Sequence, residues 1–418
     1  MTENQTALHA LNQVLTYVSG HSPYYRAHLR EFLDKDGKIN RLEDFSKLPF
    51  TTKADLSAHN EDFLCVSLNE IADFVTTSGS TGKPVSVYLT AADLDRLAEN
   101  EFASLSLMGG SSSDIYQLLT TMDKQFMAGL AYYMGVRKLN AGMVRVGPGV
   151  PQLHWESILK FKPTKLIAVP SFILSLLDYA KANHIDFQSS SVKAIVCIGE
   201  AVRREDFALN NLGKRITADW QVDLFSTYAS TEMGAAFSEC EAQNGGHLNT
   251  DLLYLEVLKA DDTVAEDGET GEIVITTLGV QGMPLVRFRT GDLAQIHYAP
   301  CACGRKTPRL GPILGRKNQM IKYKGTTVFP KAIMDILDEF PEIGLYKLEI
   351  RKNDLETDEV SILFEERLLN SKVIDKIVQK CQSGLRVLPQ FKFMPATDLH
   401  ESIYQKAKRK PEKIIFID

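Results

Sequence analysis

The chain has 418 residues, and 44% of them are hydrophobic, so it can bury a sizeable core and is not a disordered chain. This length suits a large domain together with a small one. Lys and Arg number 47 against 53 for Asp and Glu, which gives a net charge of −6. The chain therefore has no net electrostatic attraction to nucleic acid or to anionic lipid, which leaves a local basic patch open.

Export and membrane insertion are not indicated by the sequence. No stretch approaches the roughly 18 consecutive apolar residues of a membrane span, and the first residues lack the pattern of a secretory signal. The six cysteines do not form a disulfide framework in a chain of this length. We therefore expect a cytoplasmic protein with no membrane and no nucleic-acid partner, whose cysteines are free thiols or metal ligands.

The N-terminal half alternates helical and extended patterns. Apolar residues at helical spacing from Leu8 to Val18 predict an amphipathic helix. A turn-rich stretch at 34–40 follows, and the Pro and Thr residues of 48–53 predict a helix start. Two β-rich runs, 165–169 and 192–198, enclose a helical pattern at 172–182. This strand–helix–strand crossover is typical of a parallel α/β sheet.

The pattern changes after residue 250. The alternation of 272–277 behind a glycine turn predicts a β-rich subdomain. After about residue 318 a new unit begins, with a helix at 330–338 and a strand at 346–350. We expect an α/β protein with a large N-terminal domain at 1–317, built on parallel and mixed sheets with a β-rich subdomain, and a small α+β domain at 318–418.

Residues 76–84 combine hydroxyl side chains with glycines and a lysine. Glycine allows close approach of the backbone to a ligand, and N–H groups, hydroxyls and an ammonium together form an oxyanion cradle. The segment is not a Walker A loop, because Pro84 follows the lysine. Taken alone, it fits a phosphate-binding loop or a flexible surface hairpin. The candidate phosphate ligands are Ser78, Gly79, Ser80, Thr81, Gly82 and Lys83.

Further motifs follow this loop in a fixed order: Y-x-x-T-E at 228–232, G-E-x-G-E-I at 268–273, R-x-R-T-G-D at 287–292 and G-R at 315–316. The series resembles the adenylate-forming superfamily of acyl- and aryl-CoA synthetases, peptide-synthetase adenylation domains and firefly luciferase. Segments 23–26, 48–53 and 301–305 make the phenylacetate–CoA ligase family the most similar and extend the resemblance over nearly the whole chain. Fingerprints of dehydrogenases, zinc proteases and serine hydrolases are missing from the sequence.

The resemblance implies a nucleotide site. The loop at 78–83 would hold the β- and γ-phosphates of ATP, and Tyr228 would lie against adenine, beside Ala229 and Ser230 of the same motif. Thr231 would bind the α-phosphate and Glu232 would hold Mg²⁺. The structural alternatives are a half-buried core tyrosine and a solvated glutamate.

Four further positions complete the implied nucleotide site. Asp292 and Arg316 would reach the ribose, and their alternatives are a turn or N-cap aspartate and a surface arginine. Gly199 and Glu200 would lie beside adenine, although their order differs from the family's usual Gly-Ala-Glu, and a plain strand-to-helix turn fits them equally.

Near the C-terminus the resemblance implies a catalytic lysine. Family members carry a lysine that neutralises charge on the reacting carboxylate and the α-phosphate. Lys406 matches this position, with Gln405 in place of a glycine. A basic solvated tail is the alternative, and Lys408 is a second candidate.

The hinge departs from the family pattern. Asn318, followed by Gln319, stands where the family has Asp, and Lys324 replaces a customary Arg. These departures concern domain rotation and the thiol step. The acceptor thiol therefore stays open between CoA and a carrier-protein or other protein thiol, as does a third possibility, a catalytically reduced nucleotide-binding member.

Cysteine placement provides a separate signal. Cys240 and His247 are followed about fifty residues later by Cys301 and Cys303. Three thiolates and one imidazole favour tetrahedral Zn²⁺, and a site with four protein ligands would be structural. The alternative is four unrelated groups, because the spacing is not that of a standard finger.

The acid-binding pocket is implied by analogy alone. Phe126, Met127, Ala235 and Phe237 would line an apolar slot for an aromatic or other hydrophobic acid, and ordinary core packing fits each of them as well. The implied reaction uses Mg·ATP to convert a carboxylic acid to an acyl adenylate and then coenzyme A to form a thioester. Family likeness also implies a homodimer.

Overall fold

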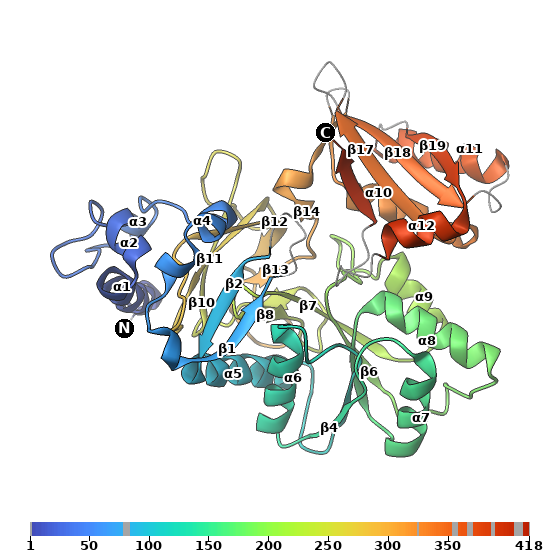
Figure 1. Cartoon of the computed structure of the whole chain (residues 1–418), viewed down its shortest axis with the longest axis horizontal. Coiled ribbons are helices and arrows are strands. Elements are labelled where there is room, and N and C mark those ends of the chain that lie inside the picture. The colour runs from blue at the N-terminus through green and yellow to red at the C-terminus, as the bar shows by residue number, and fades with distance from the viewer. Residues whose placement is uncertain are drawn as a thin grey trace. The chain divides into compact units, whose positions relative to one another are not determined.

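The computed structural model describes residues 2–77, 84–323, 326–352, 358–365, 371–385, 389–404 and 413–417. The chain divides into two compact units (Figure 1). Unit 1 consists of Met1–Thr290 and Ala294–Ile313, and unit 2 of Gly291–Leu293 and Leu314–Asp418. Sequence analysis places the boundary a few residues later, after residue 317.

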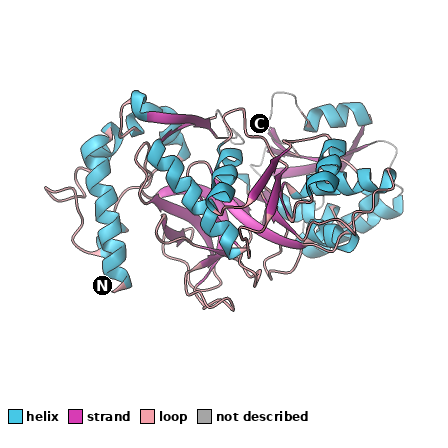
Figure 2. Ribbon diagram, turned by 90° about the horizontal axis from the view of Figure 1, so that it is seen from below, coloured by secondary structure: helices cyan, strands magenta, loops and turns pink. Residues whose placement is uncertain are grey.

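Unit 1 begins with the predicted amphipathic helix, α1 (Glu3–His21). Thr2 caps it in a capping box with Gln5, and its buried face carries Leu11, Leu15 and Val18. Figure 2 shows α1 as a long helix near the N-terminus. The short helices α2 (Pro23–His28), α3 (Leu42–Phe45) and α4 (Lys53–Ala58) follow, then the 3₁₀ turns η1 (Asn60–Phe63) and η2 (Leu68–Glu70). The predicted helix start at 48–53 is thus confirmed.

A hairpin of β1 (Ile71–Thr76) and β2 (Ser86–Thr90) encloses the predicted phosphate loop. Thr76 pairs with Ser86, and the Thr77 hydroxyl accepts a hydrogen bond of 3.0 Å from the Val85 N–H. The two ends of the loop are therefore held together. Residues 78–83 themselves lie outside the described residues.

The large sheet has the order β10-β11-β12-β13-β9-β8-β7-β6-β5-β3-β4, and β14 pairs with β12. All pairings from β4 to β7 are parallel, whereas β7 pairs with β8 in the antiparallel sense. The strands are β3 (Ile115–Leu118), β4 (Gly142–Arg145), β5 (Lys165–Ala168), β6 (Ala194–Cys197), β7 (Asp223–Ser230), β8 (Ala235–Ser238), β9 (Gly246–His247), β10 (Leu253–Leu258), β11 (Thr270–Thr277), β12 (Phe288–His297) and β13 (Arg309–Leu310). The expected mixed α/β sheet with a β-rich part is confirmed.

Helices cover both faces of the parallel strands. One apolar cluster joins these strands to α7 (Pro151–Phe161), α8 (Pro170–Ala182) and α9 (Asn211–Asp219). A second cluster joins the opposite face to α5 (Ala91–Leu107) and α6 (Met127–Lys138). The predicted crossover is β5–α8–β6, and this layering leaves the carboxyl ends of the strands to present functional groups.

Unit 2 is a four-stranded sheet in the order β19-β18-β17-β20 with helices on both faces. Alternating residues of β17 and β18 pack on α10 and α11, and Leu363 packs on α12 from the other face. Its elements are β14 (Gly315–Arg316), η3 (Lys317–Gln319), β15 (Ile321–Tyr323), β16 (Thr326–Val328), α10 (Pro330–Leu337), η4 (Pro341–Ile343), β17 (Tyr346–Lys352), β18 (Asp358–Glu365), α11 (Ser371–Lys380), η5 (Cys381–Leu385), β19 (Gln390–Met394), α12 (Ala396–Ile403) and β20 (Ile414–Ile417).

A search of the described helices for one long and apolar enough to cross a bilayer finds none.

Candidate functional site

The predicted nucleotide residues of unit 1 follow two neighbouring parallel strands. β6 ends just before Gly199 and Glu200, and β7 ends just before Thr231 and Glu232. Cys197 and Ser226 pair across these strands, so both segments leave the same edge of the sheet. Ligands of open α/β sheets bind beyond the carboxyl ends of the strands. The fold thus brings these two predicted segments to one edge.

Tyr228 is half-buried near the end of β7, and its ring stacks on Phe237 of β8 at a centroid distance of 5.9 Å. Phe237 and Ala235 are themselves buried in the core, and so is Met127 at the start of α6. Phe126, the residue before α6, is half-buried. Three of the four predicted pocket residues are therefore buried in the core.

The Glu200 carboxylate binds the start of α8. Ser171 donates to it twice, from its backbone N–H at 2.8 Å and from its hydroxyl at 3.0 Å. A negative charge at this end of a helix is stabilised by the helix dipole and by the free N–H groups. Glu200 therefore fixes the turn that follows β6, at the same sheet edge as Tyr228 and Glu232.

Glu232 forms an ion pair that sequence analysis missed. The Lys53 ammonium lies 3.1 Å from Glu232 Oε1, with 31% of the Lys53 side chain and 9% of the Glu232 side chain exposed. Lys53 is the first residue of α4, and the motif at 48–53 contained it without indicating a partner. A cation thus neutralises the carboxylate that the resemblance assigns to magnesium.

Buried polar groups on α5 hold the segment after β7. The Arg96 guanidinium donates to the carbonyls of Gly234, Leu252 and Leu278 at 2.6–2.8 Å. Asn100 accepts from the Ala236 N–H at 3.1 Å and donates to Glu101. Burial raises the pKa of Glu101 to about 7.

A second buried ion pair lies beside β7. Arg203 Nε donates to Glu239 Oε1 at 2.6 Å, and the Ser226 N–H donates to the other carboxylate oxygen at 2.7 Å. Burial raises the pKa of Glu239, against the opposing effect of Arg203. Since Arg203 also donates to the Leu224 carbonyl, the pair fixes the backbone of β7.

Asp292 and Arg316 meet within unit 2. Arg316 Nε donates to Asp292 Oδ1 at 3.1 Å, and the two residues are backbone partners in the pairing of β12 with β14. The alternative of a turn or N-cap aspartate does not hold for Asp292, because β12 continues through it to His297. Within this strand Gly291 has a φ of +76°, a backbone conformation that glycine adopts at little cost.

Several predicted residues lie beyond the described part of the chain. These are the loop residues Ser78, Gly79, Ser80, Thr81, Gly82 and Lys83, together with Lys324, Gln405, Lys406 and Lys408. Asn318 and Gln319 are described and form most of η3, where Asn318 is exposed.

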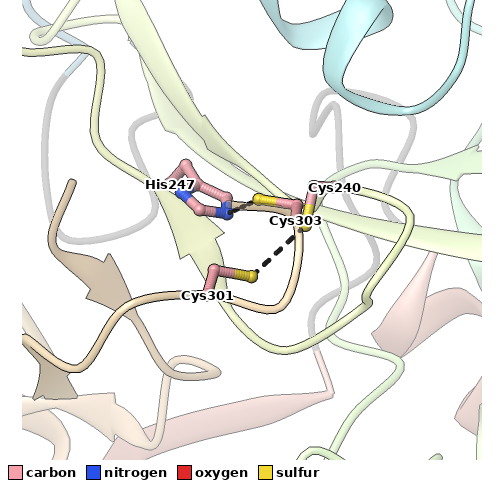
Figure 3. A group of neighbouring side chains, drawn as sticks. All are labelled: Cys240, His247, Cys301 and Cys303. Carbon is pink, nitrogen blue, oxygen red and sulfur yellow. Dashed lines mark hydrogen bonds between the residues drawn. The ribbon is translucent and has the colours of Figure 1, made fainter. Parts of the chain in front are cut away.

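Cys240, His247, Cys301 and Cys303 converge in unit 1 (Figure 3), with their ligand atoms all within 4.8 Å of one another. Cys240 Sγ lies 3.6 Å from Cys301 Sγ, and Cys303 Sγ lies 3.5 Å from His247 Nε2. Ligand atoms around a tetrahedral zinc at about 2.3 Å are separated by about 3.8 Å. The donor set and its spacing therefore fit zinc.

The local structure aims these ligands at one point. Residues 301–304 form a tight turn in which the Gly304 N–H donates to the Cys301 carbonyl at 2.9 Å. His247 lies in β9, next to β8, which leads to Cys240. Burial and the nearby Arg309 lower the pKa of His247 to about 4, so the imidazole is neutral, which is the form that binds metals.

The thiols differ in acidity. Burial raises the pKa of Cys240 to about 11. For Cys303 the effect of desolvation is outweighed by hydrogen bonds, first from the Arg305 backbone, and its pKa falls to about 7. The other cysteines, Cys65, Cys197 and Cys381, are buried free thiols.

Comparison with known proteins identifies the family. Residues 14–282 match the family of AMP-binding enzymes. A phenylacetate-coenzyme A ligase of Thermus thermophilus is 31% identical over 353 residues, covering 82% of this chain and 77% of that protein. The enzyme of the same name from Escherichia coli is 28% identical over 352 residues, covering 82% and 77%.

The same fold occurs in a solved structure of 2-hydroxyisobutyryl-CoA ligase in the postadenylation state. It matches with a TM-score of 0.84 at 22% identity, covering 99% of this chain and 89% of that one. The family match spans more than half of the chain, and the similarity to the curated relatives extends over most of its length. The chain therefore belongs to the AMP-binding enzyme family and, within it, to the group of the phenylacetate-coenzyme A ligases.

Proposed function

We propose that this enzyme activates an aromatic carboxylic acid with Mg·ATP and transfers the acyl group to coenzyme A. In the first step a carboxylate oxygen bonds to the α-phosphorus of ATP and the bond to pyrophosphate breaks. In the second step the thiolate of coenzyme A bonds to the acyl carbonyl carbon, AMP leaves, and the thiol proton passes to solvent.

The observation that carries this proposal is the convergence of the segments after β6 and β7 at one edge of the sheet. Tyr228 offers an aromatic face for adenine, and Thr231 and Glu232 offer a hydroxyl and a carboxylate directly beyond it. The relatives named above, which are phenylacetate-coenzyme A ligases, support the acid class and the acceptor.

The proposed roles follow the chemistry of each group. Thr231 binds the α-phosphate and Glu232 holds Mg²⁺, which takes one or two carboxylates and otherwise phosphate oxygens and water. Bound magnesium would neutralise charge on the phosphates. Asp292 accepts hydrogen bonds from the ribose with Arg316 beside it, and Lys406 neutralises negative charge at the reacting centre. The loop at 78–83 holds the terminal phosphates.

Pyrophosphate exchange with a panel of aryl and aliphatic acids, with and without coenzyme A, tests the proposal. We expect exchange with arylacetic or aryl acids, and a thioester only when coenzyme A is added. Exchange without thioester formation would instead indicate a protein thiol as the acceptor. No exchange with any acid would overturn the proposed activity.

We also propose that Cys240, His247, Cys301 and Cys303 hold a structural zinc ion. Four protein ligands leave no position for water, so the ion would join the segment after β8 to the turn before β13 rather than take part in the reaction. Protein purified without chelator should contain about one zinc per chain, and protein without zinc would contradict this assignment.

We propose a cytoplasmic homodimer on the basis of family likeness alone. Light scattering on the purified protein tests the dimer, and a monomeric mass would contradict it.

A further inference from the structure

We propose that Lys53 is a positioning residue for magnesium and the phosphates. It holds the Glu232 carboxylate while the nucleotide is absent, and its ammonium turns to phosphate oxygens when Mg·ATP binds. This inference rests on the proposed function of Glu232 and adds a residue from the N-terminal segment to that site.

The backbone before Lys53 is fixed from several sides. The Thr51 N–H donates to the Arg287 carbonyl at 3.1 Å, and the Arg289 N–H donates to the Thr51 carbonyl at 2.9 Å. The buried hydroxyl of Thr51 donates to the Val286 carbonyl at 2.7 Å and lies 2.9 Å from the Tyr25 hydroxyl. Thr51 therefore lies against the strand segment that begins β12.

Side chains reinforce this attachment. Two guanidinium groups contact the Phe50 ring, that of Arg287 at 4.1 Å and that of Arg289 at 4.2 Å from the ring centroid. Thr52 then caps α4 in a capping box with Asp55. Lys53, the first residue of α4, therefore follows a fixed backbone segment. Its backbone position does not depend on contacts made by its own side chain.

The partner is anchored as well. Glu232 follows β7, and two residues further on the Gly234 carbonyl accepts from Arg96 at 2.6 Å. An ion pair on the surface contributes little, because ordering two long side chains costs entropy. Here both backbones are already fixed and the carboxylate is largely buried, so less ordering is required.

The chemistry of the pair suggests an exchange of partners. An uncompensated carboxylate in a largely buried position is costly, and Lys53 removes that cost in the free enzyme. A magnesium ion bound by Glu232 also binds phosphate oxygens. An ammonium 3.1 Å from the same carboxylate is then close to those oxygens, and its three N–H donors can bind them.

Titration calorimetry of full-length protein with Mg·ATP tests this role. We expect Lys53→Met to weaken binding at least about tenfold, which corresponds to about 1.4 kcal/mol, and Lys53→Arg to retain most of the affinity. Lys47→Met is the matched control, because Lys47 is an exposed lysine of the same segment that pairs with Asp44 at 2.8 Å. Its affinity should equal that of the parent.

A double-mutant cycle separates the ion pair from general stability. If Lys53 acts with Glu232, then Lys53→Met should cost much less when Glu232→Gln is already present. The magnesium concentration for half-maximal pyrophosphate exchange should also shift in Lys53→Met, which a purely structural role would not cause.

The outcomes are distinguishable. Parent protein that binds Mg·ATP normally, with a Lys53→Met variant that binds equally well, overturns this inference and leaves the proposed function intact. Strictly additive losses in the cycle overturn the pairing with Glu232. Parent protein that neither binds Mg·ATP nor exchanges pyrophosphate overturns the proposed function itself.

Discussion

His247 and Thr307 are joined through the imidazole Nδ1 and the hydroxyl, 3.0 Å apart. This contact leaves Nε2 to face Cys303. Partners of this kind fix the ring and the tautomer of a metal-binding histidine. Thr307→Val should therefore speed the loss of zinc to a chelator about tenfold or more, measured with a colorimetric zinc indicator. Thr217→Val, on α9, serves as a control, and equal release rates for parent and Thr307→Val would contradict the role of the hydroxyl.

Glu101 should make the protein less stable as the pH rises. Its folded pKa of about 7 lies above the ordinary glutamate value of 4.5 because of burial, so between these values the folded chain holds a proton that the unfolded chain releases. The free energy of unfolding then falls across this window by about 3 kcal/mol. Urea unfolding at pH 5 and pH 7 should show this slope in the parent and a smaller one in Glu101→Gln.

Glu99→Gln is the matched control for this measurement, because Glu99 lies on the same helix but pairs with Lys138 at the surface. Its slope should match that of the parent. A parent-like slope in Glu101→Gln would show that another group titrates.

Breaking the buried pair of Arg203 and Glu239 should be costly. Glu239→Gln leaves a buried guanidinium without its counter-charge, and we expect a loss of about 3–5 kcal/mol. Lys181 and Asp219 form a surface pair at 2.7 Å, so Asp219→Asn should cost less than about 1 kcal/mol. Chemical denaturation of both variants makes the comparison, and similar losses would mean that the Arg203 pair is not effectively buried.

Asp292→Asn should weaken nucleotide binding, because an amide accepts fewer ribose hydrogen bonds than a carboxylate and loses the charge paired with Arg316. The KM for ATP should rise by about tenfold, with less effect on the KM for the acid. Asp262→Asn is a suitable control, since Asp262 pairs with Arg289 at an exposed position. An unchanged KM in Asp292→Asn would remove Asp292 from the ribose site.

Lys406→Ala should lower the rate of adenylation by two orders of magnitude or more, about the cost of losing one electrostatic contact to the transition state. Single-turnover formation of the acyl adenylate measures this step directly. Lys408→Ala should behave like the parent if the assignment is correct. The reverse result would move the role to Lys408.

Local patterns predicted much of the fold. The N-terminal helix, the crossover around α8 and the β-rich segment after residue 250 are all present. The observed ends of these elements differ from the predicted ends by a few residues, because residues at the helix ends determine where a helix begins. Pro170, at the first position of α8, starts that helix before the apolar pattern begins. The alternative of a turn aspartate at Asp292 fails because β12 continues past Gly291.

Local sequence patterns could not predict contacts between segments that are distant in the sequence. The four zinc candidates were named from residue type, but only the fold shows that their ligand atoms meet. The pairing of Lys53 with Glu232 has no spacing rule, since it depends on how residues 48–53 lie against β12. Sequence could single out the motif at 48–53, but it could not supply the partner.

The contact of the Phe50 ring with Arg287 and Arg289 has a consequence for engineering. The first fifty residues end in Phe50, an aromatic ring that contacts two arginine side chains at the start of β12. A truncation that removes these fifty residues would therefore remove the contacts of Phe50 with Arg287 and Arg289. Tags and fusion partners are better placed before α1, where they leave the Phe50 contacts intact.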